Sequence, residues 1–252
     1  MRVTKRHREI KFGVTVKVNS GKSLMVAHRG VSGIECENTN AAFIAAGNRS
    51  YFGIETDVHV TADHQFVVFH DDNTKRVSGQ DYVIEESLYV DLLNIPLYDK
   101  EEGVFRSDLH IPDLMDYIHI CKRYDKVAVL ELKNRIPTED IAQIVKKIAD
   151  ADFLDKTIFI SFDWQNLADI KEMRPEQKVQ FLLSEQCDDF LIDKLAANGM
   201  DLDIYYERVT KELVDKLHAK NIEINCWTAD HAEDAERLAE YGVDYITSNI
   251  LE

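Results

Sequence analysis

The stretch Lys126–Asp163 reads KVAVLELKNRIPTEDIAQIVKKIADADFLDKTIFISFD, and it predicts a strand, a helix and a second strand in succession. The first strand is expected over Lys126–Lys133, the helix over Thr138–Ala151 and the next strand over Thr157–Asp163. The run Val127–Leu130 is apolar at every position, so both faces of the first strand are expected to be buried. Strands of this kind are typical of a parallel sheet that is covered by helices.

The same alternation continues on both sides of this stretch. Toward the C-terminus we expect strands over Lys178–Ser184, Asp201–Tyr206, Glu223–Thr228 and Asp244–Ser248, and helices over Gln165–Met173, Asp188–Asn198, Lys211–Lys220 and Ala232–Tyr241. Toward the N-terminus we expect strands over Leu24–Gly30 and from Gly53 onward, a helix from Asn38 or Thr39 to about Tyr51, and a helix over Leu114–Arg123 capped by Asp113. Eight strands that alternate with helices predict an α/β fold, a TIM (β/α)8 barrel. A doubly wound open sheet is the alternative.

Two parts of the chain fall outside this alternation. Residues 1–23 form a basic lead-in, in which Ile10–Val18 is expected to be an extended strand, and residues 73–110 form a polar excursion after the second strand. The last predicted strand leaves no room for a full final helix before Glu252, so we expect the lead-in to cover part of the barrel instead. A barrel of this size commonly forms one domain, so a single domain is predicted over residues 1–252.

Composition narrows the classes of partner. The net charge of −16 argues against nucleic acid or an anionic membrane as the partner, since those require a basic surface. The four cysteines show no CxxC spacing and are expected to be reduced thiols. No secretory signal and no apolar run of membrane-spanning length is present, so we expect a soluble, cytoplasmic protein that acts on a small molecule and has no stable membrane insertion.

Carboxylates gather on one face of the strand that opens Gly53–Asp72, GIETDVHVTADHQFVVFHDD. Because side chains alternate along a strand, Glu55 and Asp57 point the same way, about 7 Å apart at Cα. Glu131 and Lys133 end another strand at the same spacing, and the C-terminal ends of the strands form the active-site face of such barrels. Three carboxylates make an all-oxygen site, which favours one divalent cation, Mg²⁺ or Ca²⁺, over zinc.

The formal charge of this group indicates the kind of ligand. Three carboxylates and a divalent cation leave one net negative charge, and Arg29 with Lys133 turn it into one net positive charge. A phosphodiester monoanion would neutralise that charge, and a cation with Arg and Lys is a common way to stabilise phosphoryl oxygens. His28 and His70 follow strands at the same end and are candidates for proton transfer. Which imidazole acts as base and which as acid stays open.

Eight short motifs occur together along the chain. They are AHRG at Ala27–Gly30, ENT at Glu37–Thr39, ETDV at Glu55–Val58, VVFHDD at Val67–Asp72, LELK at Leu130–Lys133, SFD at Ser161–Asp163, CWT at Cys226–Thr228 and DYITSN at Asp244–Asn249. In this order the motifs resemble the glycerophosphodiester phosphodiesterase family. The matched segment, residues 27–249, is nearly the whole chain.

The resemblance implies a TIM-type barrel in which Glu55, Asp57 and Glu131 hold the divalent metal. It implies acid–base work by His28 and His70, and it identifies residues 73–110 as the insertion that this family carries after its second strand. The activity implied is hydrolysis of glycerophosphodiesters to glycerol phosphate and an alcohol, in lipid and glycerol metabolism.

Some assignments stay open at the level of sequence. Phe162 and Trp227 lie at strand ends inside matched motifs and are expected to line the substrate site. His59 shares the parity of Glu55 and Asp57 and could face the metal, but hydrophilic strand ends are usually solvated. Lysophospholipid hydrolysis is the alternative substrate class. An aldolase-like barrel with Lys133 as a Schiff-base lysine is a weaker alternative, because carboxylates nearby would hold the amine protonated. The sequence leaves the leaving alcohol and the oligomeric state undetermined.

Overall fold

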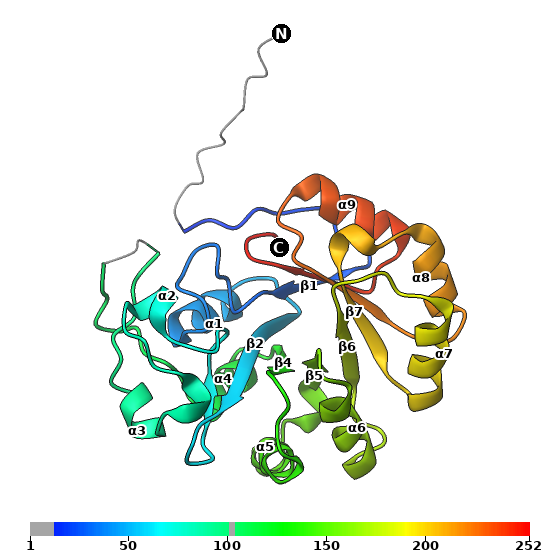
Figure 1. Ribbon diagram of the computed structural model, residues 1–252. Helices are drawn as coiled ribbons and strands as arrows, with labels where there is room; N and C mark the ends of the chain where they lie inside the picture. The colour runs from blue at the N-terminus through cyan, green and yellow to red at the C-terminus, as the bar shows by residue number, and fades with distance from the viewer. Residues whose placement is uncertain (1–12, 101–103) are drawn as a thin grey trace.

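Eight parallel strands close into a barrel in the computed structural model of the protein, which describes residues 13–100 and 104–252 (Figure 1). The strands are β1 (Leu24–Ala27), β2 (Gly53–Val60), β4 (Val127–Leu132), β5 (Thr157–Ser161), β6 (Val179–Leu183), β7 (Asp201–Tyr205), β8 (Ile224–Trp227) and β9 (Tyr245–Ser248). The barrel closes because β1 pairs with β2 on one side and with β9 on the other, where Leu24 lies opposite Tyr245. The TIM barrel prediction is therefore confirmed, and the doubly wound open sheet is excluded.

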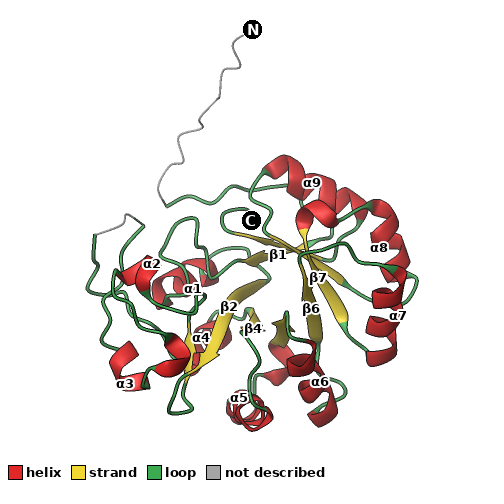
Figure 2. Cartoon of the chain, viewed as in Figure 1, coloured by secondary structure: helices red, strands yellow, loops and turns green. Residues whose placement is uncertain are grey.

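Among the described residues, seven helices of eight residues or more connect successive barrel strands and form the outer layer (Figure 2). They are α1 (Asn40–Gly47), α4 (Leu114–Arg123), α5 (Thr138–Asp150), α6 (Trp164–Met173), α7 (Asp189–Asn198), α8 (Lys211–His218) and α9 (Ala232–Tyr241). Polar caps set where several of them begin: the Asp113 carboxylate, for example, accepts hydrogen bonds from the backbone N–H groups of Met115 and Asp116 at the start of α4. The capped helix then buries the apolar face predicted for it, Leu114, Tyr117, Ile118 and Cys121.

A separate layer is added to one side of the barrel after β2. The short strand β3 (Phe66–Val68) pairs antiparallel with β2, with Val58 opposite Val68. The following segment contains the short helices α2 (Lys75–Ser78) and α3 (Tyr89–Leu92), with a 3-10 turn, Ile84–Glu86, between them. Its apolar residues join the outer face of β3 in a cluster of their own, which contains Val67, Phe69, Ile84, Leu92, Ile95, Leu97, Leu109 and Ile111. This packing holds the segment beside the strand that carries His70.

The lead-in differs from the strand expected over Ile10–Val18. Residues 10–12 of that range lie outside the described residues, and in residues 13–18 only an isolated parallel bridge forms, between Val16 and Leu251. The Val16 and Val18 N–H groups donate to the carbonyl oxygens of Ile250 and Glu252. In Figure 1 the lead-in crosses the circumference of the barrel between α1 and α9. The described part of the lead-in thus packs along the C-terminal residues, where another helix would follow in a regular barrel.

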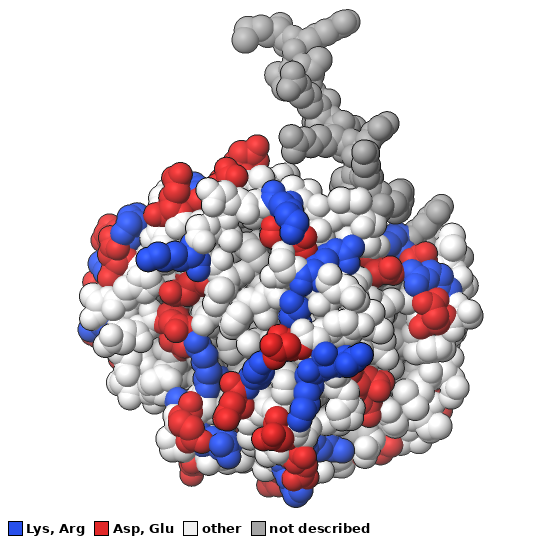
Figure 3. Space-filling view, turned by 180° about the vertical axis from the view of Figure 1, so that it is seen from behind, with Lys and Arg blue, Asp and Glu red and all other residues white. Residues whose placement is uncertain are grey.

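Charges are mixed on the outer surface. On the face drawn in Figure 3, Lys and Arg side chains are interspersed with Asp and Glu side chains across the described residues. Among the helices of the described residues, none is long and apolar enough to cross a membrane.

Candidate active site

A buried triad of carboxylates stands at the C-terminal ends of β2 and β4. Glu55, Asp57 and Glu131 each offer an oxygen, and these oxygens all lie within 4.8 Å of one another. Asp57 lies opposite Glu131 in the parallel register of β2 and β4, which explains why residues far apart in the sequence meet here. Asn38 fixes the Asp57 side chain by donating an Nδ2 hydrogen bond of 2.8 Å to Oδ2. The three ligand candidates predicted from the sequence are thus brought together.

Two cationic side chains contact the triad. Lys133 Nζ lies 2.8 Å from Glu131 Oε1 and 3.4 Å from Asp57 Oδ1, and Arg29 Nε lies 3.6 Å from Asp57 Oδ2. The backbone N–H of Arg29, a residue with φ of 51°, also donates to Glu55 Oε2 at 2.7 Å. Both predicted phosphate-binding cations therefore stand at the edge of the same cluster.

Burial and crowding change the proton affinity of the carboxylates. Burial, followed by the charge of Asp57, raises the pKa of Glu131 to about 8, and the same two causes raise the pKa of Glu55 well above its usual range. Burial also disfavours the charged form of Asp57, but Lys133 and Arg29 hold its pKa below the usual range. A divalent cation between the three oxygens would replace this repulsion with attraction, so the donor set fits a hard cation.

Lys133 is held as a cation by the same contacts. Burial alone would lower its pKa, but the charges of Asp57 and Glu131 outweigh burial and raise it. A protonated amine does not attack a carbonyl, so these contacts oppose the Schiff-base alternative.

His28 follows β1, and asparagine holds its orientation. Its Nδ1 lies 2.7 Å from Asn249 Oδ1, an atom that only accepts hydrogen bonds, so Nδ1 carries the proton in this contact and Nε2 is left toward the site. Nε2 is 3.9 Å from Glu55 Oε2. Asp230 in turn fixes Asn249, whose Nδ2 and backbone N–H donate to it at 2.6 and 2.8 Å. Burial, assisted by the Arg29 charge, lowers the pKa of His28 to about 4.

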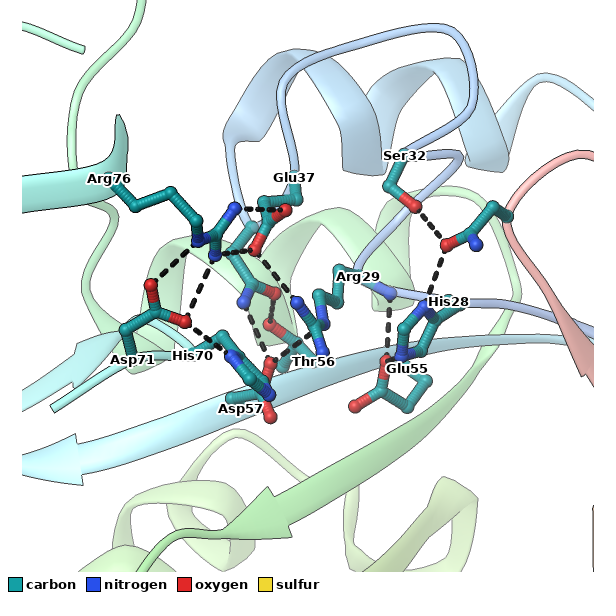
Figure 4. Close-up of polar contacts among 12 residues, drawn as sticks. His28, Arg29, Ser32, Glu37, Glu55, Thr56, Asp57, His70, Asp71 and Arg76 are labelled. Atoms are coloured by element: carbon teal, nitrogen blue, oxygen red, sulfur yellow. Dashed lines mark hydrogen bonds and ion pairs between the residues drawn. The ribbon is translucent and has the colours of Figure 1, made fainter. Parts of the chain in front are cut away.

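His70 follows β3 and is held from the opposite side. Its Nδ1 lies 2.6 Å from Asp71 Oδ1, and Asp71 accepts from Arg76 Nε at 2.7 Å. Arg76 also donates two hydrogen bonds to Glu37, which accepts a further one from Arg29 Nη1 at 2.9 Å. Figure 4 shows this continuous chain of contacts from His70 to Arg29, with His28 on the other side of Arg29. Burial lowers the pKa of His70 as well, although Asp57 opposes that shift.

The two aromatic residues predicted to line the substrate site lie at its mouth. The Phe162 and Trp227 rings meet edge to face, with centroids 5.7 Å apart, and both line the same cavity as His28, His70 and Lys133. Phe162 is 46% exposed, so its ring is open to a bound molecule.

Other candidates have different positions. His59 is fully buried, but it does not join the triad: its Nδ1 lies 3.0 Å from Glu85 Oε1, in the inserted segment. Glu37 bridges two arginines, in accord with a role in holding its loop. All four cysteines are free, and burial raises the pKa of the Cys36 thiol to about 11.

Sequence reasoning missed three residues that contribute to the site. Asn249 lies within a matched motif, but its role depends on a contact with His28 across 221 positions. Arg76 lies in the segment that we described only as a polar excursion. Asp203 lines the cavity. It lies two positions before Tyr205 on β7, so its side chain is on the same face as that of Tyr205, and this alternation could have identified it from the sequence.

Two imidazoles beside a buried carboxylate triad, at the end of a TIM barrel where active sites are found, are the arrangement expected of an enzyme. Comparison with known proteins gives the particular class: the chain belongs to the glycerophosphoryl diester phosphodiesterase family, whose model matches residues 28–251. It is accordingly a hydrolase.

Individual relatives agree with this assignment. The chain is 30% identical to a glycerophosphodiester phosphodiesterase of Caldanaerobacter subterraneus subsp. tengcongensis, over 90% of this chain and 94% of the relative. It is also 30% identical to a lysophospholipase D of Homo sapiens, but over only 48% of this chain and 40% of that protein.

Solved structures share the fold. An Oleispira antarctica phosphodiesterase in complex with the product sn-glycerol-3-phosphate aligns with a TM-score of 0.82 and 24% identity, over 93% of this chain and 96% of that one. A glycerophosphodiester phosphodiesterase of Thermotoga maritima aligns with a TM-score of 0.74 and 22% identity, over 90% of this chain and 94% of that one.

Proposed function

We propose that the chain hydrolyses glycerophosphodiesters to glycerol phosphate and an alcohol, and that it uses a divalent cation held by Glu55, Asp57 and Glu131. The observation that carries this proposal is the placement of two imidazoles, His28 and His70, beside one buried carboxylate triad. The whole chain would act as one barrel domain, with residues 73–110 as an insertion in it, in cytoplasmic lipid and glycerol metabolism.

The triad itself supports the presence of a cation. Asp57 Oδ1 is buried and accepts no hydrogen bond from a described residue, although Lys133 Nζ lies 3.4 Å away, and it lies close to the oxygens of two other buried carboxylates. Oxygen-only donors suit Mg²⁺ or Ca²⁺. When bound, such a cation supplies positive charge that lowers the pKa of a neighbouring hydroxyl and stabilises negative charge on phosphoryl oxygens.

The cationic side chains bind and orient the phosphodiester. Arg29 and Lys133 both border the cavity and would donate to the non-bridging phosphoryl oxygens. Their present carboxylate partners keep both side chains in place before substrate arrives, so little reorganisation is needed on binding.

Proton transfer falls to the two imidazoles. Each has Nδ1 engaged by a partner, Asn249 for His28 and Asp71 for His70, which leaves Nε2 of each ring for the substrate. One imidazole takes the proton of the attacking hydroxyl and the other protonates the departing alcohol. The nucleophile is the hydroxyl next to the esterified carbon of glycerol, because intramolecular attack gains a large effective concentration over water. This attack breaks the phosphorus–oxygen bond to the alcohol and forms a cyclic glycerol phosphate, which a water molecule then opens to glycerol phosphate while the two imidazoles exchange their roles.

A substrate analogue tests this route. A glycerophosphodiester whose vicinal hydroxyl is replaced by hydrogen should bind as a competitive inhibitor and should not be turned over. Hydrolysis of the analogue at nearly the parent rate would show that water attacks directly. Loss of glycerophosphocholine hydrolysis with EDTA, and its return with Mg²⁺ or Ca²⁺, tests the need for the cation in the same assay.

Lysophospholipids are the second candidate substrates, because the chain is 30% identical to a lysophospholipase D over 48% of its length. A panel that measures released choline, ethanolamine, glycerol and lysolipid products separates the two classes.

A further inference from the structure

The wall of the cavity that faces the triad has no role in the chemistry described so far. The cavity, about 70 Å³ in volume, is bordered on one side by two carboxylates of the triad, Glu55 and Glu131, and by the cations Arg29 and Lys133. The other side is formed by strands β5 to β9, whose residues at the cavity are Ile160, Phe162, Leu182, Asp203, Trp227 and Thr247. This wall is mostly apolar, so its polar atoms stand out.

Asp203 has a carboxylate oxygen without a partner. The side chain is 2% exposed, and its Oδ2 accepts a hydrogen bond from Asn225 Nδ2 at 3.2 Å. Its Oδ1 is buried and receives no hydrogen bond from any described residue. Burial, assisted by the charge of Glu131, raises the pKa of Asp203 well above its usual range. Buried polar atoms are nearly always satisfied in native proteins, which indicates that Oδ1 meets a ligand.

Trp227 presents the complementary atom. Its indole Nε1 is buried and donates to no acceptor within residues 13–100 and 104–252. In the register of β7 and β8, Asn225 lies opposite Asp203 and Trp227 lies opposite Tyr205, so Trp227 is one pleat nearer the mouth than Asp203. The rings of Phe162 and Tyr205, each with its centroid 5.7 Å from that of Trp227, hold the indole in place.

We infer that Asp203 and Trp227 form a subsite for the terminal hydroxymethyl group of the glycerol moiety. A hydroxyl group both donates and accepts, so it can satisfy the two unpartnered atoms, while Ile160 and Leu182 contact its carbon. This inference rests on the proposed function. If the vicinal hydroxyl of the glycerol moiety lies beside the triad, the terminal carbon of the same moiety points toward the opposite wall of the cavity.

The subsite would discriminate between glycerophosphodiesters and lysophospholipids. In a lysophospholipid acylated at the terminal position, that hydroxyl is an ester, which cannot donate a hydrogen bond to Asp203. The chain should therefore prefer diesters of free glycerol to lysophospholipids. A site built to bind a hydroxyl rejects analogues that lack it, because its own buried groups are then left unpaired.

The test compares two substrates that differ only in this group. Glycerophosphocholine has it, whereas 2-hydroxyethyl phosphocholine keeps the vicinal hydroxyl and lacks the hydroxymethyl. The wild-type enzyme should favour glycerophosphocholine in kcat/KM by about 10- to 100-fold. Asp203→Leu and Trp227→Phe should each reduce this ratio toward one, and Asp203→Asn, which keeps hydrogen-bonding atoms, should retain part of it. Glu86→Gln, at an exposed position of the turn Ile84–Glu86 and not among the residues that line the cavity, should leave the ratio unchanged.

Equal ratios in the wild-type enzyme and in both variants would overturn the subsite and leave the hydrolytic function standing. If the wild-type protein hydrolyses neither diester, the proposed function fails, and calorimetry then tests the subsite by comparing the affinities for sn-glycerol 3-phosphate and 2-hydroxyethyl phosphate. A preference for sn-glycerol 3-phosphate that is lost in the variants supports the subsite. Equal affinities for the two compounds overturn it. If Asp203→Leu does not fold, as judged by circular dichroism, Trp227→Phe and Asp203→Asn give the result.

Discussion

Protonation of Glu131 competes with cation binding. Its pKa of about 8 means that it is protonated below that pH and ionised above it, in the absence of bound metal. Cation binding requires the ionised form, so affinity should increase with pH up to about 8, by up to about tenfold per unit for each proton released, and the raised pKa of Glu55 acts in the same direction. Calorimetric titration with Mg²⁺ or Ca²⁺ between pH 6 and 9, in two buffers of different ionisation heat, measures both the affinity and the proton release. A flat profile would contradict this coupling.

Each carboxylate of the triad should contribute to that affinity. Glu55→Gln, Asp57→Asn and Glu131→Gln each remove one anionic ligand, so each should weaken cation binding by about tenfold or more. Glu86→Gln, on an exposed turn of the inserted segment, is the matched control and should bind as the wild type does. Unchanged titrations in all three triad variants would remove the metal assignment.

The two imidazoles should set the pH dependence of turnover. Because the pKa of His28 is lowered to about 4, this ring is neutral near pH 7, and activity should fall as the pH drops through about 4 and the ring gains a proton. His28→Ala and His70→Ala should each reduce kcat by at least ~10²-fold, while cation binding persists. The measurement is a profile of kcat against pH for each variant. A variant that keeps nearly full activity would end the two-histidine scheme.

At the level of elements, the short helix α2, within residues 73–110, holds the hydrogen-bond partners of two site residues. Arg76 holds both Asp71, the partner of His70, and Glu37, the partner of Arg29. Arg76→Ala should therefore reduce kcat by about 10- to 100-fold, in keeping with the loss of other supporting partners, and should affect cation affinity little. Arg76→Lys should rescue only part of the rate, because an ammonium cannot serve both carboxylates with a planar fork.

The neighbouring residue provides the control for this prediction. Lys75 lies on the same helix, but its ammonium pairs with the exposed Asp81 at 3.5 Å. Lys75→Ala should leave kcat unchanged. Equal effects of the two alanine variants would indicate that α2 acts through its folding alone.

The elements themselves were largely predictable. Helix α4 follows its sequence prediction because Asp113 supplies the cap and the apolar residues recur at helical spacing. The strand expected in the lead-in was wrong in residues 13–18, because alternation there reflects a bridge to Leu251 rather than a ladder. Alternation of residue types shows that a segment can be extended, but not whether a partner strand is available.

At the level of the whole molecule, the eightfold alternation was sufficient for the barrel. The triad followed from parity on two strands, since the strands of a parallel barrel point their C-terminal ends to one face. The supporting contacts did not follow, because they join segments that no local pattern relates. Arg76 and Glu37 are 39 positions apart, and no sequence pattern around either residue indicates that they contact one another.

The contact between His28 and Asn249 bears on the time at which the enzyme becomes active during its own synthesis. His28 is among the early residues to leave the ribosome, but Asn249 follows 221 positions later, and β9 must be made before β1 can close the barrel. The triad residues on β2 and β4 all lie within the first 131 positions of the chain. The ring of His28 is therefore the group of the site whose partner is made last.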